Sequence, residues 1–401
     1  MADPPPHAVA IVSAVRTPIG RFGGSLRSVP ATALGTLATR AALERAGWAP
    51  AEVEEVLFGQ AIQAGAGQNP ARQVLRGAGI PDAVGAATIN MVCGSGMKAI
   101  QLGFSAVRSG EFDRVVVGAM ESMSNAPYLL PGAMRWGSLP GPHTLDDGMQ
   151  RDALIDAYEE HEIMGLTGER VAKKFGLSRA DVDAYGLRSH LRASRAVAGG
   201  TFAPELVPVP ERLTPGGHGL DHDEAPRADT TLEKLARLPP AFAPDGILTA
   251  GNSSKLSDGA AALTLASARE VRDKGYRPLA WVHSIAESGV HPRDVMESPI
   301  PTVKKHLART GLAPGDFARV EHNEAYASAS IAVQRTFGFT EEQFNVHGGA
   351  VALGHPIGAS GARIVVTLVH ELARSRTELG LATLCMGGGN GLSVAVDRVG
   401  L

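Results

Sequence analysis

Apolar and polar positions in the first 122 residues follow two patterns, one typical of buried strands and one typical of amphipathic helices. Apolar, β-branched runs predict strands at 8–16, 54–62, 86–93 and 113–122. Apolar residues at helical spacing predict helices at 31–47, 69–79 and 97–110. The run at 113–122 is almost wholly apolar, as expected of a buried parallel strand. Strands that alternate with helices indicate an α/β sheet.

The pattern changes after Ser122 and resumes further along the chain. Residues 123–246 contain a turn-rich stretch, two helical patterns at 155–175 and 179–198, and then polar loop. Such a long interruption is typically functional or an excursion from the core, and we interpret it as an inserted loop domain. From about Arg277 a second series of strand and helix patterns follows. The sequence therefore predicts two α/β halves, formed by 1–122 plus 247–274 and by 275–401.

Composition narrows the class of protein. The 401 residues are 44% hydrophobic and 20% charged, with a net charge of -3, which argues against a nucleic-acid surface. No apolar run is long enough to predict a membrane span, and the N-terminus lacks the basic start of a signal peptide. Two cysteines in so long a chain fit a reducing compartment, so we expect a cytoplasmic protein.

Cys93 is a candidate nucleophile because it lies between a predicted strand and a predicted helix. Backbone N–H groups and the dipole of a helix N-terminus favour a thiolate there. A buried, inert cysteine is the alternative on local grounds. The same residues also fit a weak dinucleotide fingerprint, with Gly94, Gly96 and Ala99 in the loop and Glu121 to hold a ribose.

Further candidates lie in the second half. His355, in a Gly- and Pro-flanked loop before a predicted helix, could act as a base or as a donor to a carbonyl oxygen. Asn323 follows a strand, and local pattern alone favours a helix-capping role. Cys385 precedes a three-glycine turn whose free N–H groups suit an oxyanion hole, or simply a tight hairpin. The His- and Asp-rich stretch 218–224 lacks metal-ligand spacing and is interpreted as a solvated loop.

Taken together, these motifs closely resemble the thiolase family over nearly the whole chain. Seven of them occur in the family's order: SAVRTPIGRFGG (13–24), NMVCGSGMKA (90–99), GAMESMSNAPYLLP (118–131), TAGNSSKLSDGAA (249–261), NEAYA (323–327), GGAVALGHPIGASG (348–361) and CMGGGNG (385–391). The resemblance implies the thiolase fold, an α/β protein with two similar layered halves (αβαβα) and an inserted loop domain. It also implies an acyltransferase that condenses two acetyl-CoA reversibly to acetoacetyl-CoA and CoA.

The resemblance assigns roles to the candidate residues. In thiolases the cysteine matching Cys93 is acylated, and the histidine matching His355 activates it. The cysteine matching Cys385 is the acid/base toward the second substrate. The asparagine matching Asn323 holds a water that helps to stabilise the thioester oxygen. The N–H groups of Cys93 and Gly387 match a second oxyanion hole.

Coenzyme A contacts are also implied by the resemblance. Arg227 matches an arginine near the adenine nucleotide, and Ser254 matches a serine that faces the pantetheine. Met164 and Phe242 match apolar residues of the pantetheine or acyl pocket. Lys234 stands where many relatives carry serine, so it adds a phosphate contact or has no role.

Three departures from the family pattern stand out, and the first two lie in regions expected to touch the acyl pocket. Ile163 replaces a usual histidine, the stretch VMESPIPT (295–302) is one residue shorter than usual, and Tyr326 replaces a usual phenylalanine in what looks like a conservative change. Chain-length preference is therefore open between acetoacetyl-CoA and longer 3-ketoacyl-CoA, the degradative alternative. A carrier-protein ketoacyl synthase would use Cys with two His, whereas this chain has the Cys, His and Cys set. A thiolase-like lipid-binding protein often lacks a catalytic residue, and none is lacking here.

The expected partners are acetyl-CoA or acyl-CoA and CoA, with no nucleic acid and no membrane. No cofactor is expected, because the CoA thioester is the substrate, and no metal is expected. The family forms dimers and tetramers, and residues 124–137 resemble its tetramerising loop, so we expect a homodimer or homotetramer.

Overall fold

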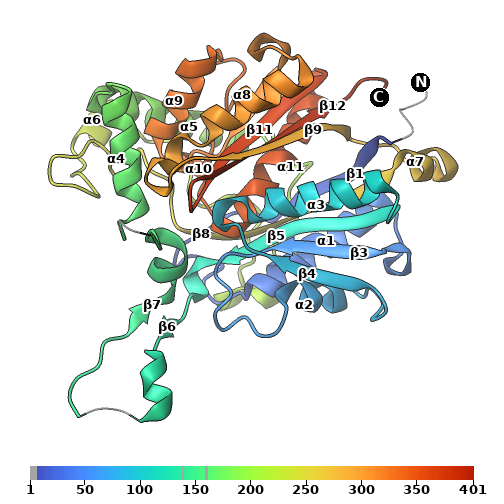
Figure 1. Ribbon diagram of the computed structural model, residues 1–401, viewed down its shortest axis with the longest axis horizontal. Coiled ribbons are helices and arrows are strands. Elements are labelled where there is room, and N and C mark those ends of the chain that lie inside the picture. Colours follow the sequence, from blue (N-terminus) through green and yellow to red (C-terminus); the bar gives the residue numbers. More distant parts are fainter. Residues whose placement is uncertain (1–6, 138–139, 159–160) are drawn as a thin grey trace.

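The computed structural model of the protein describes residues 7–137, 140–158 and 161–401. Its main sheet divides into two halves that follow each other in the chain (Figure 1). The first half consists of β1 (Val9–Arg16), β3 (Glu55–Gly59), β4 (Gly85–Ile89), β5 (Arg114–Ser122) and β8 (Ser257–Ser267), with the short β2 (Gly20–Arg21) beside β8. The second half consists of β9 (Ala280–Gly289), β10 (Arg319–His322), β11 (Leu379–Met386) and β12 (Asn390–Asp397).

The two halves share one strand order. The first reads β3-β5-β8-β1 and the second reads β10-β11-β12-β9. In each half the first pair is parallel and the next two pairs are antiparallel. Only two residue pairs connect β1 with β9, Ala10 with Trp281 and Ile11 with Ala280, so the hydrogen-bonded link between the halves is narrow. The family resemblance implied two similar halves, and the shared order confirms this similarity.

Helices form the remaining layers. Helices α3 (Ser95–Ser109) and α11 (Ile357–Ser375) pack against each other and lie in the core between the two half-sheets. The outer faces are covered by α1 (Ala31–Ala46) and α2 (Pro70–Gly77) on the first half, and by α8 (Pro299–Thr310) and α9 (Ala327–Phe337) on the second. The result is the five-layered αβαβα arrangement that the family resemblance implied.

Strand β5 shows how sequence places a strand between two helical layers. Val115 and Val117 join the central core with α3 and α11, while Val116 joins the outer core with α1 and α2. Successive side chains of a strand point to opposite faces, so a strand covered on both faces must be apolar throughout. The continuous apolar run at 113–122 is therefore explained by burial on both faces.

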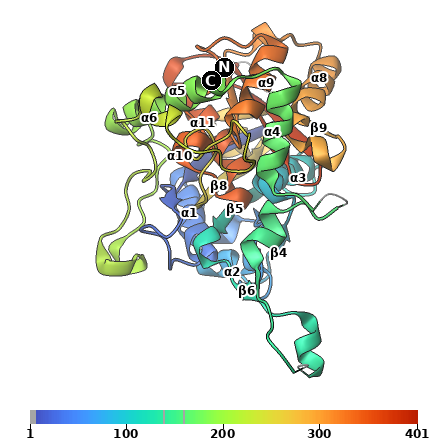
Figure 2. The same ribbon diagram turned by 90° about the vertical axis from the view of Figure 1, so that its left-hand side faces the viewer.

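The segment between β5 and β8 adds no strand to the main sheet within its described residues. It contains a small two-stranded sheet, formed by β6 (Tyr128–Leu129) and β7 (Asp146–Asp147). It also contains the helices α4 (Met164–Lys174), α5 (Arg179–Ala198) and α6 (Leu232–Ala236). The arm that carries β6 and β7 projects from the body of the molecule in both views (Figures 1 and 2). Two short helices outside this segment, α7 (Ala268–Lys274) and α10 (Ala350–Leu353), complete the fold.

The helix predicted at 155–175 is wrong in its first part. Ile155 pairs with Ile163 in a β-bridge, so the chain reverses there and α4 begins only at Met164. Glu159 and Glu160, within the predicted helix, lie outside the described residues. Across the described part of the chain, no helix combines the length and apolar character needed to span a membrane.

Candidate active site

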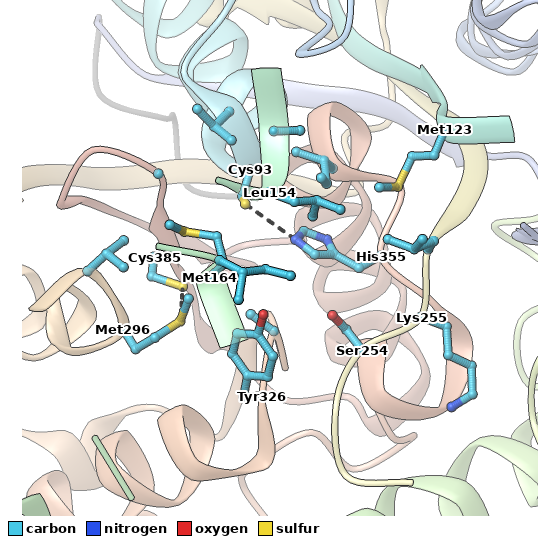
Figure 3. A pocket seen from close by; sticks show the side chains of 18 of the residues that line it. Cys93, Met123, Leu154, Met164, Ser254, Lys255, Met296, Tyr326, His355 and Cys385 are labelled. Atoms are coloured by element: carbon cyan, nitrogen blue, oxygen red, sulfur yellow. Dashed lines mark hydrogen bonds between the residues drawn. The ribbon is translucent and has the colours of Figure 1, made fainter. Parts of the chain in front are cut away.

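Cys93 and His355 occupy equivalent places in the two halves. Cys93 lies in a single 3-10 turn, Val92–Gly94, directly before α3. His355 lies between α10 and α11, two residues before α11 begins. Because α3 and α11 pack together in the middle layer, the residues that precede them face each other (Figure 3).

The turn that presents Cys93 is strained. Val92 has φ of 49°, a region that β-branched residues rarely adopt, and such strain clusters at functional sites. Gly94 is required by close packing, since a Cβ atom there would lie 1.7 Å from the Met386 Sδ atom. The chain therefore holds the turn that carries Cys93 in a conformation that local preference alone would not produce.

The contact between Cys93 and His355 is direct. The Cys93 Sγ atom lies 3.3 Å from His355 Nε2, within the range for a sulfur hydrogen bond. On the other side of the ring, His355 Nδ1 lies 2.5 Å from the Ser360 Oγ atom, and the Ser360 hydroxyl donates to the Pro356 carbonyl at 3.0 Å. A hydroxyl that donates its only proton to a carbonyl must accept from the imidazole. His355 then carries its proton on Nδ1, which leaves Nε2 free to accept the Cys93 proton.

Both members of this pair are neutral at rest. Dense packing around the sulfur raises the pKa of Cys93 to about 12, although N–H groups of Gly387 and of Cys93 itself bond the sulfur and lower the pKa in part. Burial lowers the pKa of His355 to about 3. The N–H groups favour the thiolate, as expected of a helix N-terminus, but desolvation outweighs them and the resting group is the thiol. A nucleophilic role for Cys93 therefore requires transfer of its proton to a base, and His355 Nε2 is in contact with the sulfur.

Asn323 completes the surroundings of His355. Its Nδ2 atom lies 3.5 Å from His355 Nε2, and its side chain is fully buried at the end of β10. Helix α9 begins at Ala327 with Tyr326 as the preceding residue, so Asn323 is not the helix cap that local pattern favoured. Its Oδ1 atom has no hydrogen-bond partner among the described residues, which leaves an acceptor available for a water or a ligand.

Cys385 and Gly387, which belong to the second half, also lie close to Cys93. Cys385 lies near the end of β11, with its Sγ atom 3.6 Å from the Met296 Sδ atom. Burial raises the pKa of Cys385 well above its ordinary value. Gly387 lies in the turn between β11 and β12, and its N–H group points at the Cys93 sulfur. The Cys93 thiol therefore faces an imidazole, a second thiol and a backbone donor.

These groups open onto one cavity of about 280 Å³, which we call the active-site pocket. Among the predicted coenzyme A contacts, Met164, Phe242 and Ser254 line it. Much of the rest of its wall is apolar, with Val92, Met123, Ala153, Leu154, Ile163, Leu256, Val295, Met296, Ala325 and Ile357. Ile163 and part of the stretch 295–302 therefore contact the pocket, as the departures from the family pattern suggested.

Two predicted contacts lie outside this pocket. Arg227 is exposed, and its backbone N–H donates to His190 Nδ1 at 3.2 Å. Lys234 is also exposed and pairs with Asp229, with its Nζ atom 2.6 Å from Oδ2. The structure thus brings the catalytic candidates and the apolar contacts together, and places both cations on the surface.

The alternative interpretations do not fit this geometry. The Glu121 carboxylate is buried and accepts the N–H groups of Ala61 and Gly358, each at 3.0 Å, so it is not available to a ribose. The stretch 218–224 is not uniformly solvated as predicted, because Asp223 is buried and binds Arg16 through two hydrogen bonds of 2.7 and 2.9 Å. Within the described residues, no group of three or more His, Cys, Asp or Glu is placed to hold a metal ion.

Three contacts in the site could not be predicted from the sequence, although the stretch 295–302 and the change at position 326 were noted. Ser360 acts through the His355 ring, Met296 contacts Cys385, and the hydroxyl of Tyr326 faces the pocket (Figure 3). A serine in the first turn of a helix is an ordinary feature, and only the fold shows that it meets an imidazole. The change from phenylalanine at position 326 was the one available signal for the Tyr326 hydroxyl.

Comparison with known proteins agrees with this arrangement. Residues 9–269 match the thiolase N-terminal domain, and residues 276–398 match the thiolase C-terminal domain. An acetyl-CoA acetyltransferase of Pseudomonas aeruginosa is 46% identical over 391 residues, which cover 97% of this chain and 99% of that protein. One from Escherichia coli is 44% identical over 389 residues, covering 97% and 98%. A crystal structure of the Bacillus anthracis acetyl-CoA acetyltransferase matches with a TM-score of 0.93 at 39% identity, covering 98% of each chain. The chain belongs to the thiolase family.

Proposed function

We propose that the protein is an acetyl-CoA C-acetyltransferase that condenses two acetyl-CoA reversibly to acetoacetyl-CoA and CoA. The observation that carries this proposal is the 3.3 Å contact between Cys93 Sγ and His355 Nε2 in a pocket that also contains Cys385 and the N–H group of Gly387. The names of the relatives support the same activity.

In the first half-reaction, Cys93 is acetylated. The thiol passes its proton to His355 Nε2 as the sulfur attacks the thioester carbon of acetyl-CoA. The N–H groups of Cys93 and Gly387, which already point at the sulfur, stabilise the oxyanion that forms. Collapse breaks the bond to CoA, which leaves as the thiol with the proton of Cys385. Cys385 becomes the thiolate, and His355 keeps the proton of Cys93.

In the second half-reaction, a new carbon–carbon bond forms. Cys385, as thiolate, takes a proton from the methyl carbon of a second acetyl-CoA, and the enolate oxygen is held by His355 and a water bound to Asn323. The enolate carbon attacks the acetyl carbon on Cys93 and releases the Cys93 sulfur, which takes its proton back from His355. In the reverse direction Cys385 deprotonates CoA, which then attacks the acyl-cysteine.

Substrate contacts divide between the pocket and the surface. Ser254, Met164 and Phe242 line the pocket, where we place the pantetheine arm and the acyl group. Arg227 and Lys234 are exposed, and we assign them to the adenine nucleotide and its phosphates. The steps require a thiol, an imidazole and backbone donors, so we propose CoA thioesters as substrates without a separate cofactor.

We propose a preference for acetoacetyl-CoA over longer 3-ketoacyl-CoA in thiolysis. The cavity of about 280 Å³ lies at the lower end of the usual range for ligand pockets, which favours a short acyl group beside the pantetheine. The test is kcat/KM for thiolysis of C4, C6, C8 and C12 substrates, together with acetoacetyl-CoA formation from acetyl-CoA alone. A maximum at C4 is expected. A maximum at C8 or beyond would favour a degradative 3-ketoacyl-CoA thiolase.

We also propose a cytoplasmic homotetramer, or a homodimer, for the assembled enzyme. The projecting arm that carries β6 and β7 exposes Tyr128, Leu130 and Trp136, the last at 86% of its surface. Apolar side chains gathered on a projecting segment are typical of association sites. Light scattering of the purified protein measures its mass, and a monomer would contradict the proposal.

A further inference from the structure

The wall of the active-site pocket carries the hydroxyls of Ser254 and Tyr326. Figure 3 shows the Tyr326 side chain with its hydroxyl directed toward the space between Cys93, His355 and Cys385. Among the residues drawn there, no hydrogen bond reaches this hydroxyl. The neighbouring wall residues Met164, Phe242 and Met296 offer no strong hydrogen-bonding group.

The orientation of the Tyr326 ring is fixed by packing. It meets the Phe242 ring edge to face, with centroids 5.6 Å apart and planes at 86°. On another side, a Cβ atom at Gly168 would lie 3.0 Å from ring atoms, so helix α4 approaches the ring closely. The backbone of Tyr326 pairs with Ser253 in a β-bridge. The hydroxyl therefore cannot turn away to find another partner.

This hydroxyl stays protonated through the reaction. Burial raises the pKa of Tyr326 far above its ordinary value, and negative charge on Cys93 or Cys385 raises that pKa further. A neutral phenol in this place donates one hydrogen bond and accepts others. When the pocket is filled by water, or by a short acyl group with water beside it, these bonds are made.

We infer that the Tyr326 hydroxyl restricts the active-site pocket to short acyl chains. The inference rests on the proposed function and deepens it by naming a residue that sets chain length. A longer chain that extends past Tyr326 replaces its water with methylene groups and leaves a buried hydroxyl without a partner. The cost of an unmade hydrogen bond of this kind corresponds to about 10- to 100-fold in binding. A phenylalanine ring in the same place carries no such penalty.

The test compares Tyr326→Phe with the wild-type enzyme. The measured quantity is the ratio of kcat/KM for the C8 substrate to that for the C4 substrate in thiolysis. We expect this ratio to rise about 10-fold or more in Tyr326→Phe. The matched control is Tyr276→Phe, which removes a hydroxyl outside the pocket and outside the projecting arm and leaves the ratio unchanged. An unchanged or lower ratio in Tyr326→Phe would overturn the inference.

A binding measurement separates this inference from the proposed function. Calorimetry measures the dissociation constants of butanoyl-CoA and octanoyl-CoA. The two proteins compared are Cys93→Ala and the double variant Cys93→Ala, Tyr326→Phe. Neither variant needs to turn over for this measurement. The added Tyr326→Phe change should favour octanoyl-CoA over butanoyl-CoA by about 10-fold. If the wild-type protein cleaves no 3-ketoacyl-CoA, the proposed function fails, and this ratio still decides the role of Tyr326. Equal ratios in the two variants would contradict that role.

Discussion

His355 Nε2 lies 3.3 Å from Cys93 Sγ, although 262 positions separate the two residues in the chain. Each residue precedes the central helix of its own half, so the pairing of α3 with α11 creates the contact. Desolvation keeps the thiol and the imidazole neutral, and in the proposed reaction the proton moves only when substrate is attacked. The two halves of the fold thus each contribute one member of the nucleophile pair.

The two cysteines should be separable by mutation. Cys93→Ala removes the nucleophile and should abolish acetylation and turnover, with a loss of at least about 10⁴-fold. Cys385→Ala keeps Cys93 and His355, so it should still become acetylated by acetyl-CoA. It should fail in condensation and thiolysis, because only the second half-reaction needs a proton taken from the incoming substrate. Mass spectrometry and steady-state assays measure the two steps, and full turnover by Cys385→Ala would refute its role.

Ser360→Ala should slow the first half-reaction by about 10- to 100-fold, because His355 Nδ1–H loses its acceptor and the productive tautomer is no longer fixed. The rate of Cys93 acetylation in a single turnover measures this step. Ser105→Ala is the matched control, since Ser105 also donates to a helix carbonyl four residues back, but on an exposed part of α3. Equal rates in Ser360→Ala and wild type would show that Ser360 does not orient His355.

Much of the fold could be predicted from the sequence, because strands covered on both faces leave long apolar runs. Helix α5 begins and ends at the predicted residues, Arg179 and Ala198. The start of α4 could not be predicted, because the bridge between Ile155 and Ile163 is a tertiary contact. A local sequence pattern predicts single helices and strands. It does not predict which distant elements pair with each other.

The candidate site, too, could be predicted only in part from the sequence. Cys93, His355 and Cys385 were identifiable from their motifs, and the structure brings them to one pocket. The protonation of Cys93 was not predictable, because the local signal of a helix N-terminus contains no measure of burial. The contact of Ser360 with His355 likewise depends on side-chain direction, which the sequence does not state.

Acid should destabilise the protein in part through His322. This histidine is fully buried and has no role in the proposed reaction, and burial lowers its pKa to about 3. The unfolded chain binds a proton at His322 below about pH 6.5 while the folded chain does not, so stability is present above that pH and lost as pH falls. Between pH 7 and pH 5, wild type should lose about 2 kcal/mol more than His322→Gln. Urea unfolding at the two pH values measures the difference, and parallel losses would contradict it.

The central claim is that Cys93 carries the acyl group, and peptide mapping after incubation with [14C]acetyl-CoA tests it most directly. The enzyme is mixed with labelled acetyl-CoA, quenched in acid to preserve the thioester, digested and mapped. The account predicts label on the peptide that contains Cys93, and none on that peptide in Cys93→Ala. Label on the Cys385 peptide, or an absence of label from the wild-type protein, would contradict it.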